Sequence, residues 1–191
     1  MNRFWKTVSI VTLLSVGAIF TGWAVTNRSP GKGAEVVSKT SRPTAKVGTA
    51  IGDTAPDFQL ASIGGAPISL ADLRGQPAVL VFWTAWCPVC KEEAPHFNKL
   101  AAQYETLGVR VLGINIQDSL ARTESGIKDF GIRYAVVRDA DAGVARLYKV
   151  TGTPTILFLD RQGIVRYFGN ELPADYPARL DALIQEGSAA Q

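Results

Sequence analysis

The sequence predicts an α/β domain carried behind an N-terminal membrane helix, and three observations lead to this prediction. Residues 7–25 form a run of nineteen residues without a charge. From residue 49 onward, short apolar runs alternate with segments whose apolar residues recur every three or four positions, the pattern of strands followed by helices. The chain then ends in two apolar runs around a tight turn and a final helix, which predicts a closing hairpin.

The uncharged run from Thr7 to Val25 predicts a single-pass anchor over residues 1–26. At ~1.5 Å per residue, a helix of this length nearly spans the ~30 Å hydrocarbon layer. Arg3 and Lys6 precede the run, which predicts a cytoplasmic N-terminus. The expected location is therefore the inner membrane, with the remaining domain in the periplasm. A cleaved secretory signal, with small residues near Gly22, stays open as the alternative.

Residues 27–48 are polar and basic and show no apolar periodicity, so they predict a flexible linker to the domain at 49–191. Residues 1–48 hold seven Lys/Arg and one acid, whereas residues 49–191 hold thirteen Lys/Arg and sixteen acids. A mildly acidic domain lacks the basic footprint that nucleic-acid binding requires. Two cysteines and one histidine are too few for a four-thiolate zinc site or a multi-histidine metal centre. We therefore expect no metal and no nucleic-acid partner.

The elements of the domain follow from local pattern. The continuous apolar run 78–83 predicts a strand covered on both faces. Pro88 at the start and Gly108 at the end delimit a helix over 88–107, kinked by Pro95. By the same reasoning, further strands are expected at 55–60, 68–70, 109–116, 135–137, 155–160 and 164–168, and further helices at 119–130, 141–148 and 173–186.

Cys87-Pro88-Val89-Cys90 lies where the buried strand turns into the long helix. There, unpaired backbone N–H groups and the helix dipole favour a thiolate at Cys87, and the spacing brings Cys90 within bonding reach one turn later. Cys87 would attack a substrate disulfide and Cys90 would resolve the mixed disulfide, so the pair is the redox-active centre and no other cofactor is expected. A structural disulfide or half of a zinc site are the other readings of such a pair.

The domain resembles the membrane-anchored, extracytoplasmic TlpA/ResA/CcmG (DsbE) group of thioredoxin-fold proteins, and within it the ScsD-like branch. The resemblance covers residues 50–187 and rests on G-D-T-A-P-D-F-Q-L at 52–60, F-W-T-A-W-C-P-V-C-K at 82–91 and G-T-P-T at 152–155. It implies a thioredoxin fold, with a mixed central sheet flanked by helices. It also implies protein thiols and disulfides as substrates and a transmembrane thiol electron donor.

Glu93 is the candidate proton acceptor for Cys90. It falls on the inward stripe of the helix, one turn after Cys90, and the ResA-like group carries a functional glutamate at this spacing. Cytoplasmic thioredoxins instead use an aspartate six residues before the first cysteine, where this sequence has Val81. A glutamate that simply reaches solvent is the alternative.

Thr153-Pro154 precedes an apolar strand, and the resemblance implies a cis peptide bond that faces the cysteine pair. The backbone of Thr153 would then pair with an extended substrate segment. An ordinary trans proline at a strand start is the other interpretation. Trp86, beside the first cysteine, is expected to shield the disulfide and contact substrate.

Three functions compete at this stage. Thiol–disulfide exchange outside the cytoplasm leads, since disulfides persist there. A copper-delivery protein is disfavoured because Sco-type proteins use C-x-x-x-C and a distal histidine, whereas His96 lies on the helix beside the pair. A thiol peroxidase is disfavoured because Leu80 stands where peroxiredoxins place a proline.

The direction of electron flow is less constrained by the motifs. The two residues between the cysteines, Pro88-Val89, match neither those of cytoplasmic thioredoxins nor those of strong oxidants. At residues 152–155, G-T-P-T replaces the G-V-P-E of cytochrome c maturation proteins. A buried Glu93 would disfavour the thiolate of the reduced form and make the protein less oxidising. The balance favours a reductant or an isomerase-like exchange.

Overall fold

The computed structural model describes residues 46–188, and these form a mixed sheet of seven strands in the order β2-β1-β5-β4-β3-β6-β7. The strands β3, β4 and β5 run parallel, while β1, β6 and β7 pair antiparallel with their neighbours. The strands are β1 (Gln59–Ser62), β2 (Ile68–Ser69), β3 (Ala78–Trp83), β4 (Arg110–Ile116), β5 (Ala135–Asp139), β6 (Thr155–Leu159) and β7 (Val165–Gly169). The predicted mixed central sheet and closing hairpin are confirmed.

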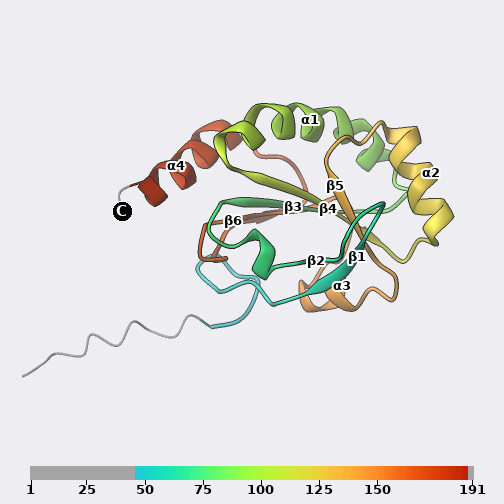
Figure 1. Cartoon of the computed structure of the whole chain (residues 1–191), viewed down its shortest axis with the longest axis horizontal. Coiled ribbons are helices and arrows are strands. Elements are labelled where there is room, and N and C mark those ends of the chain that lie inside the picture. Colours follow the sequence, from blue (N-terminus) through green and yellow to red (C-terminus); the bar gives the residue numbers. More distant parts are fainter. Residues whose placement is uncertain (1–45, 189–191) are drawn as a thin grey trace, which may run out of the picture. The chain divides into compact units, whose positions relative to one another are not determined.

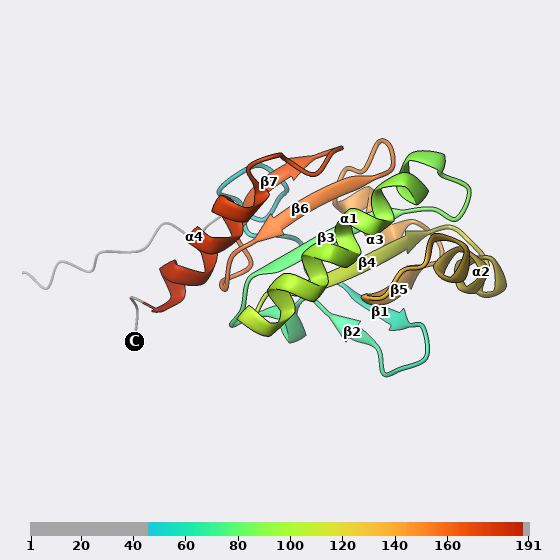
Figure 2. The ribbon, with the colours of Figure 1, turned by 90° about the horizontal axis from the view of Figure 1, so that it is seen from above.

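Helices cover both faces of this sheet. In Figure 1, α1 (Pro88–Tyr104), α2 (Leu120–Phe130) and α4 (Tyr176–Ser188) lie above the sheet, and α3 (Gly143–Leu147) lies below it. Viewed from above in Figure 2, α1 crosses the sheet in front of its central strands. Two short 3₁₀ helices, Ala71–Leu73 and Glu105–Leu107, complete the elements of the described part.

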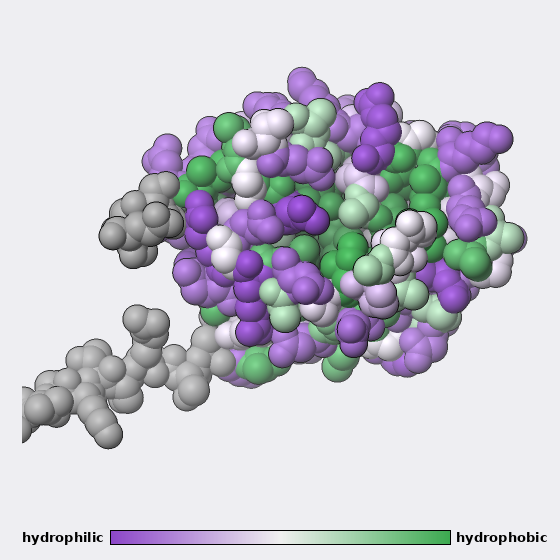
Figure 3. Space-filling view, in the orientation of Figure 1, coloured by the Kyte–Doolittle hydropathy of each residue, from purple (hydrophilic) through white to green (hydrophobic). Residues whose placement is uncertain are grey.

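The central strand β3 divides the hydrophobic core into two layers. Every residue of β3 is buried, and its side chains alternate between the faces. Val79, Val81 and Trp83 pack with α1 and α4, whereas Leu80 and Phe82 pack with α3. Burial of each large apolar side chain contributes about 1.5–3 kcal/mol, so this strand anchors both layers. Figure 3 shows mainly hydrophilic side chains on the outer surface of this view, with hydrophobic ones visible between them.

The first expected strand was placed too early. The sequence predicts a strand at 55–60, but β1 begins at Gln59. Pro56 has no N–H to donate to a ladder, and Thr54 instead forms isolated bridges with Val47 and Ile164. The bridge to Val47, together with a bond from the Gly48 N–H to the Thr54 carbonyl, ties the end of the predicted linker to the domain.

The long helix agrees closely with its prediction. It begins at Pro88 and contains Pro95, and after the 3₁₀ turn Gly108 adopts the left-handed conformation with φ 85°. The final helix starts at Tyr176 rather than at residue 173.

The predicted anchor at 1–26 and nearly all of the linker at 27–48 lie outside the described residues. Among residues 46–188, no helix combines the length and apolar character needed to cross a membrane.

Candidate active site

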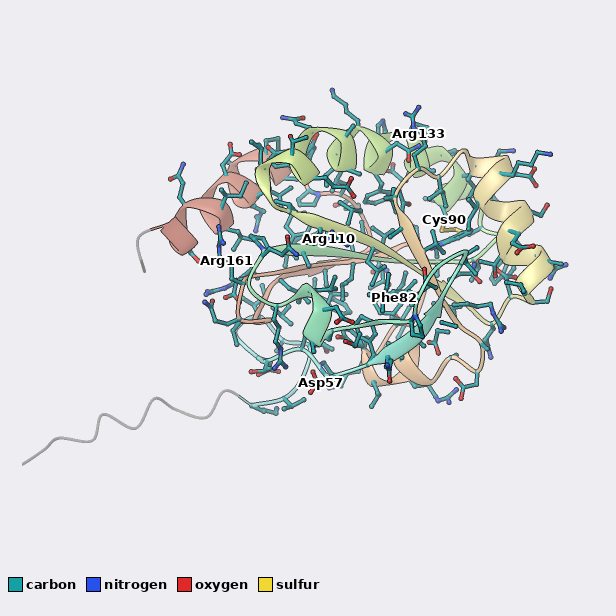
Figure 4. The ribbon with its side chains drawn as sticks, in the orientation of Figure 1. Asp57, Phe82, Cys90, Arg110, Arg133 and Arg161 are labelled. Carbon is teal, nitrogen blue, oxygen red and sulfur yellow. A yellow bond between two sulfur atoms is a disulfide. The ribbon has the colours of Figure 1, made fainter. Side chains whose placement is uncertain are left out.

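A disulfide joins Cys87 and Cys90 at the start of α1, directly after the loop that leaves β3. The two Cα atoms lie 5.2 Å apart, and both residues are buried, with exposed fractions of 4% and 5%. Figure 4 places the Cys90 side chain at the end of α1 that lies beside α2. The predicted pairing of the two cysteines is therefore present, at the position the strand-to-helix turn indicates.

Cys87 is the N-cap residue of α1. Its backbone is extended, with φ −86° and ψ 109°, and its sulfur accepts a hydrogen bond from the Cys90 N–H at 3.1 Å. Pro88 occupies the first helical position, where its missing N–H has no cost. A sulfur at this point faces the unpaired N–H groups and positive dipole end of the helix, both of which stabilise negative charge.

The peptide bond between Thr153 and Pro154 is cis, as the resemblance implies. The Thr153 carbonyl oxygen lies 3.4 Å from the Cys87 sulfur, which brings the two distant motifs into contact. Side chains beyond the bond hold this loop in place: the Thr155 hydroxyl donates to the Gly152 carbonyl at 2.7 Å, and the Asn170 amide donates to the Pro154 carbonyl at 3.0 Å.

Trp86 separates two hollows that border the disulfide. Its side chain is 68% exposed. On one side, a hollow of 310 Å³ is lined by Cys87, Lys91, Asp129 and other residues of the loop, α1 and α2. On the other side lies a groove of 230 Å³, whose lining includes Thr153. Cys87, and not Cys90, lines the first hollow, so Cys87 is the cysteine of the pair that borders it.

Glu93 lies on the same helix, one turn after Cys90. Its side chain is half-buried, and one carboxylate oxygen lies 3.2 Å from the Nδ1 of the exposed His96. Both residues line a separate hollow with Tyr176 near the start of α4. Within the described residues, no hydrogen bond links Glu93 to either sulfur, so the proton-acceptor role stays a prediction. Val81, at the position of the thioredoxin aspartate, is fully apolar and buried.

The predicted inward stripe of α1 is confirmed at its apolar positions. Asn98 is an additional buried member that the periodicity misses. Its amide donates to the Gly131 carbonyl at 2.8 Å and its oxygen accepts from the Arg133 N–H at 2.9 Å. It therefore joins α1 to the connection between α2 and β5.

Sequence reasoning also missed a buried polar network beneath the active-site loop. The Asp118 carboxylate accepts the Ala85 N–H at 2.7 Å and the Asn115 amide at 2.9 Å. The Asn115 oxygen in turn accepts the Thr123 hydroxyl at 2.7 Å. All three side chains are at most 5% exposed. Because these buried polar groups bond one another and the Ala85 N–H, the network fixes the loop two residues before Cys87. The signal for this network in the sequence was the presence of polar residues directly after a buried strand.

Comparison with known proteins agrees with this geometry. A model of the AhpC/TSA family matches residues 51–168. The thiol-disulfide oxidoreductase ResA of Geobacillus thermodenitrificans is 35% identical over 123 residues, which cover 64% of this chain and 71% of that protein. ResA of Bacillus subtilis is 32% identical over 114 residues, covering 60% and 64%. A secreted Mycobacterium tuberculosis disulfide oxidoreductase homologous to E. coli DsbE superposes with a TM-score of 0.57 at 31% identity, over 65% of this chain and 95% of that one.

Proposed function

Because the chain belongs to the AhpC/TSA family and its ResA relatives are thiol-disulfide oxidoreductases, we propose that it exchanges disulfides with protein substrates through Cys87 and Cys90. The observation that carries the proposal is the disulfide itself. It sits at a helix start, its first sulfur borders an open hollow, and a distant cis-proline loop contacts that sulfur. A disulfide that closes so short a loop stabilises a fold by at most about 2 kcal/mol, which favours a chemical role over a structural one.

In the reductive direction, the Cys87 thiolate attacks one sulfur of a substrate disulfide. The substrate S–S bond breaks, a mixed disulfide forms, and the released substrate thiolate takes up a proton. Cys90 then loses its proton and attacks the Cys87 sulfur, which releases the second substrate thiol and forms the Cys87–Cys90 bond. Two electrons pass from the protein to the substrate, and the reverse sequence oxidises a dithiol. Glu93, or water, accepts the Cys90 proton.

The backbone of Thr153 is the proposed contact for an extended substrate segment. Its carbonyl lies beside the Cys87 sulfur, which is the atom joined to substrate in the mixed disulfide. Trp86, next in sequence to that sulfur and largely exposed, supplies apolar contact area. Thr153, Cys87 and Trp86 therefore surround the point at which the S–S bond exchanges.

We further propose that electrons flow from the protein to its substrates and that a transmembrane thiol donor renews the dithiol. The half-buried Glu93 supports this direction, because a carboxylate one helical turn after Cys90 disfavours the thiolate and lowers the oxidising power. Residues 1–26 would anchor the chain in the inner membrane with residues 49–191 in the periplasm. Protease accessibility of the domain in spheroplasts tests this topology, and protection of the domain would reject it.

The function is tested by insulin reduction with the purified full chain and dithiothreitol. The expected result is rapid precipitation of insulin chains that depends on Cys87. Hydroperoxide in place of insulin is expected to give no turnover, and titration with copper is expected to give no tight stoichiometric binding. A chain that consumes hydroperoxide but leaves insulin intact would reject the proposal in favour of a peroxidase.

A further inference from the structure

We propose that the hollow between the start of α1 and the end of α2 binds cystine, the disulfide of two free cysteine molecules, and that the protein reduces it. The inference rests on the proposed function and adds a small-molecule substrate to the protein substrates. The volume of the hollow is 310 Å³, at the lower end of the range for small-molecule sites. Its lining includes Ala85, Trp86, Cys87, Lys91, Asp129 and Phe130.

The hollow carries one cation and one anion on different walls. Lys91 lies in the first turn of α1 and Asp129 in the last turn of α2, and both are exposed. Among residues 46–188, neither forms an ion pair with the other or with a third residue. The Ser125 hydroxyl donates to one oxygen of the Asp129 carboxylate at 3.2 Å, which leaves the second oxygen for a ligand. The hollow therefore offers a positive and a negative group to one bound molecule.

Neither charge is placed to stabilise its helix. The start of a helix carries partial positive charge and its end partial negative charge, so a lysine at the start of α1 and an aspartate at the end of α2 are each unfavourable. Charges of the opposite sign would stabilise both helices. Local choices that oppose the fold are expected at functional sites, and Lys91 and Asp129 border the same hollow as Cys87.

Contacts behind the hollow hold its walls at a fixed spacing. The Asn98 amide of α1 donates at 2.8 Å to the backbone carbonyl directly after Phe130, which joins α1 to the end of α2. The Phe130 ring packs against Trp83, with ring centroids 5.6 Å apart. The Ala85 N–H bonds to the Asp118 carboxylate at 2.7 Å, which fixes the third wall. The two charged walls are thus in place before a ligand binds, and this lowers the cost of binding.

Cystine combines the features that this hollow requires. Each half carries an ammonium and a carboxylate group on one carbon, and a single methylene group separates that carbon from the sulfur. When the sulfur approaches Cys87, the carboxylate can pair with Lys91 and the ammonium with Asp129. A cysteine inside a protein chain has its amino and carboxyl groups in peptide bonds and lacks both charges. The pair of charges therefore selects the free amino acid.

The reaction follows the exchange chemistry proposed for protein disulfides. The Cys87 thiolate attacks one sulfur of cystine, the cystine S–S bond breaks, and the released cysteine thiolate takes up a proton from water. Cys90 then attacks the Cys87 sulfur, the second cysteine leaves, and the Cys90 proton passes through water to that cysteine. Two electrons move from the protein to cystine, which becomes two cysteine molecules. A thiol donor must then reduce the Cys87–Cys90 bond again.

The test measures how fast the reduced full chain reacts with three disulfides: cystine, cystamine, which carries only ammonium groups, and 3,3′-dithiodipropionate, which carries only carboxylates. After an acid quench, the free thiols of the protein are alkylated and counted by mass spectrometry. Each rate is divided by the rate of the same disulfide with dithiothreitol, which corrects for the reactivity of the disulfide itself. The uncharged bis(2-hydroxyethyl) disulfide reports the reactivity of Cys87 in each variant.

We expect the corrected rate for cystine to exceed the rates for cystamine and dithiodipropionate about threefold each, the size expected of one exposed ion pair. A corrected rate for cystine no greater than that for either singly charged disulfide, with the hydroxyethyl disulfide still reacting, would overturn the cystine inference alone. Loss of the hydroxyethyl disulfide reaction in the parent would overturn the proposed function instead.

Charge-neutral variants assign the two contacts. Lys91→Gln is expected to remove the advantage of cystine over cystamine, and Asp129→Asn its advantage over dithiodipropionate. Lys99→Gln and Glu124→Gln, at exposed positions on the same two helices but outside this hollow, are the matched controls and are expected to change neither ratio. Advantages that persist in the two hollow variants, or that disappear equally in the controls, would overturn the inference.

Urea unfolding separates a binding role from a structural one. Because each charge opposes its helix dipole, Lys91→Gln and Asp129→Asn are expected to leave the midpoint urea concentration unchanged or slightly raised. A lower midpoint in both variants would show that the two charges serve the fold, and it would overturn their assignment to a ligand.

Discussion

The two ends of the central sheet make their turns with different residues. At the end remote from the disulfide, the left-handed positions are glycines, Gly108 before β4 and Gly163 between β6 and β7, with φ 85° and 80°. At the disulfide end, Gln117, Ala142 and Lys149 take up the left-handed conformation instead, at φ 53–57°. A Cβ in this conformation costs about 1–2 kcal/mol, so backbone strain is concentrated at the disulfide end of the sheet.

Buried carboxylates stabilise both ends, but they hold different kinds of structure. Asp160 accepts the N–H groups of Gln162 and Ile164 and pairs with Arg166, which closes the β6–β7 turn. Asp139 accepts the N–H groups of Val144 and Ala145 at the start of α3. The same chemistry therefore serves a closed turn at one end and an open site at the other.

The largest expected effect is on catalysis and is confined to the disulfide end. Cys87→Ala is expected to lower the rate of insulin reduction to the uncatalysed background, because no other thiol in the chain combines a helix start with an open hollow. The free energy of unfolding should fall by at most about 2 kcal/mol. Insulin precipitation and urea unfolding measure the two effects, and a variant that still reduces insulin would contradict the assignment.

Removal of the two buried carboxylates sharpens the comparison. Asp139→Ala and Asp160→Ala each leave two backbone N–H groups without partners, so each is expected to lower the free energy of unfolding by about 3 kcal/mol. Only Asp139→Ala, at the disulfide end, should also lower the rate of insulin reduction. Urea titration and the insulin assay test this, and an equal loss of rate in both variants would refute a separate role for the disulfide end.

Glycine exchange tests where the strain lies. Lys149→Gly, at an exposed position, is expected to raise the free energy of unfolding by about 1 kcal/mol, and Gly108→Ala is expected to lower it by a similar amount. An added Cβ at Gly108 meets no atom within 4 Å, so the second change reports backbone strain alone. If Lys149→Gly destabilised the protein, the left-handed conformation of Lys149 would not be strained.

The smallest effect concerns Tyr148, which precedes Lys149 and acts only at alkaline pH. Its hydroxyl donates to the Pro56 carbonyl at 2.7 Å, and burial raises the pKa of this phenol above its ordinary value. Because the folded state holds the proton more tightly, its stabilising contribution is complete below a pH of about 10 and declines as the pH rises further. Urea unfolding from neutral to alkaline pH should show this decline, and Tyr148→Phe should reduce it. An identical decline in the variant would show that other groups cause it.

Structure that depends on residues close together in the sequence could be predicted from the sequence. The buried strand at 78–83, the helix start at Pro88 and the cysteine pair between them all follow from local pattern. The contact between Cys87 and Thr153 joins residues 66 positions apart, and resemblance to a family was needed to expect it. The bond from Ala85 to Asp118 arises from strand order, which no local pattern specifies. Helical periodicity predicts Glu93 on the inward stripe of α1; its carboxylate contacts the neighbouring His96, and its proton-acceptor role stays a prediction.

The central claim is that Cys87 is the sulfur that exchanges with substrate, and trapping tests it most directly. Reduced full chains carrying Cys90→Ala or Cys87→Ala are mixed with a disulfide-bonded peptide, quenched with acid and examined by mass spectrometry. The account predicts a mixed disulfide on Cys87 in the Cys90→Ala chain and little adduct on Cys90 in the Cys87→Ala chain. Equal trapping by both sulfurs, or preferential trapping by Cys90, would contradict it.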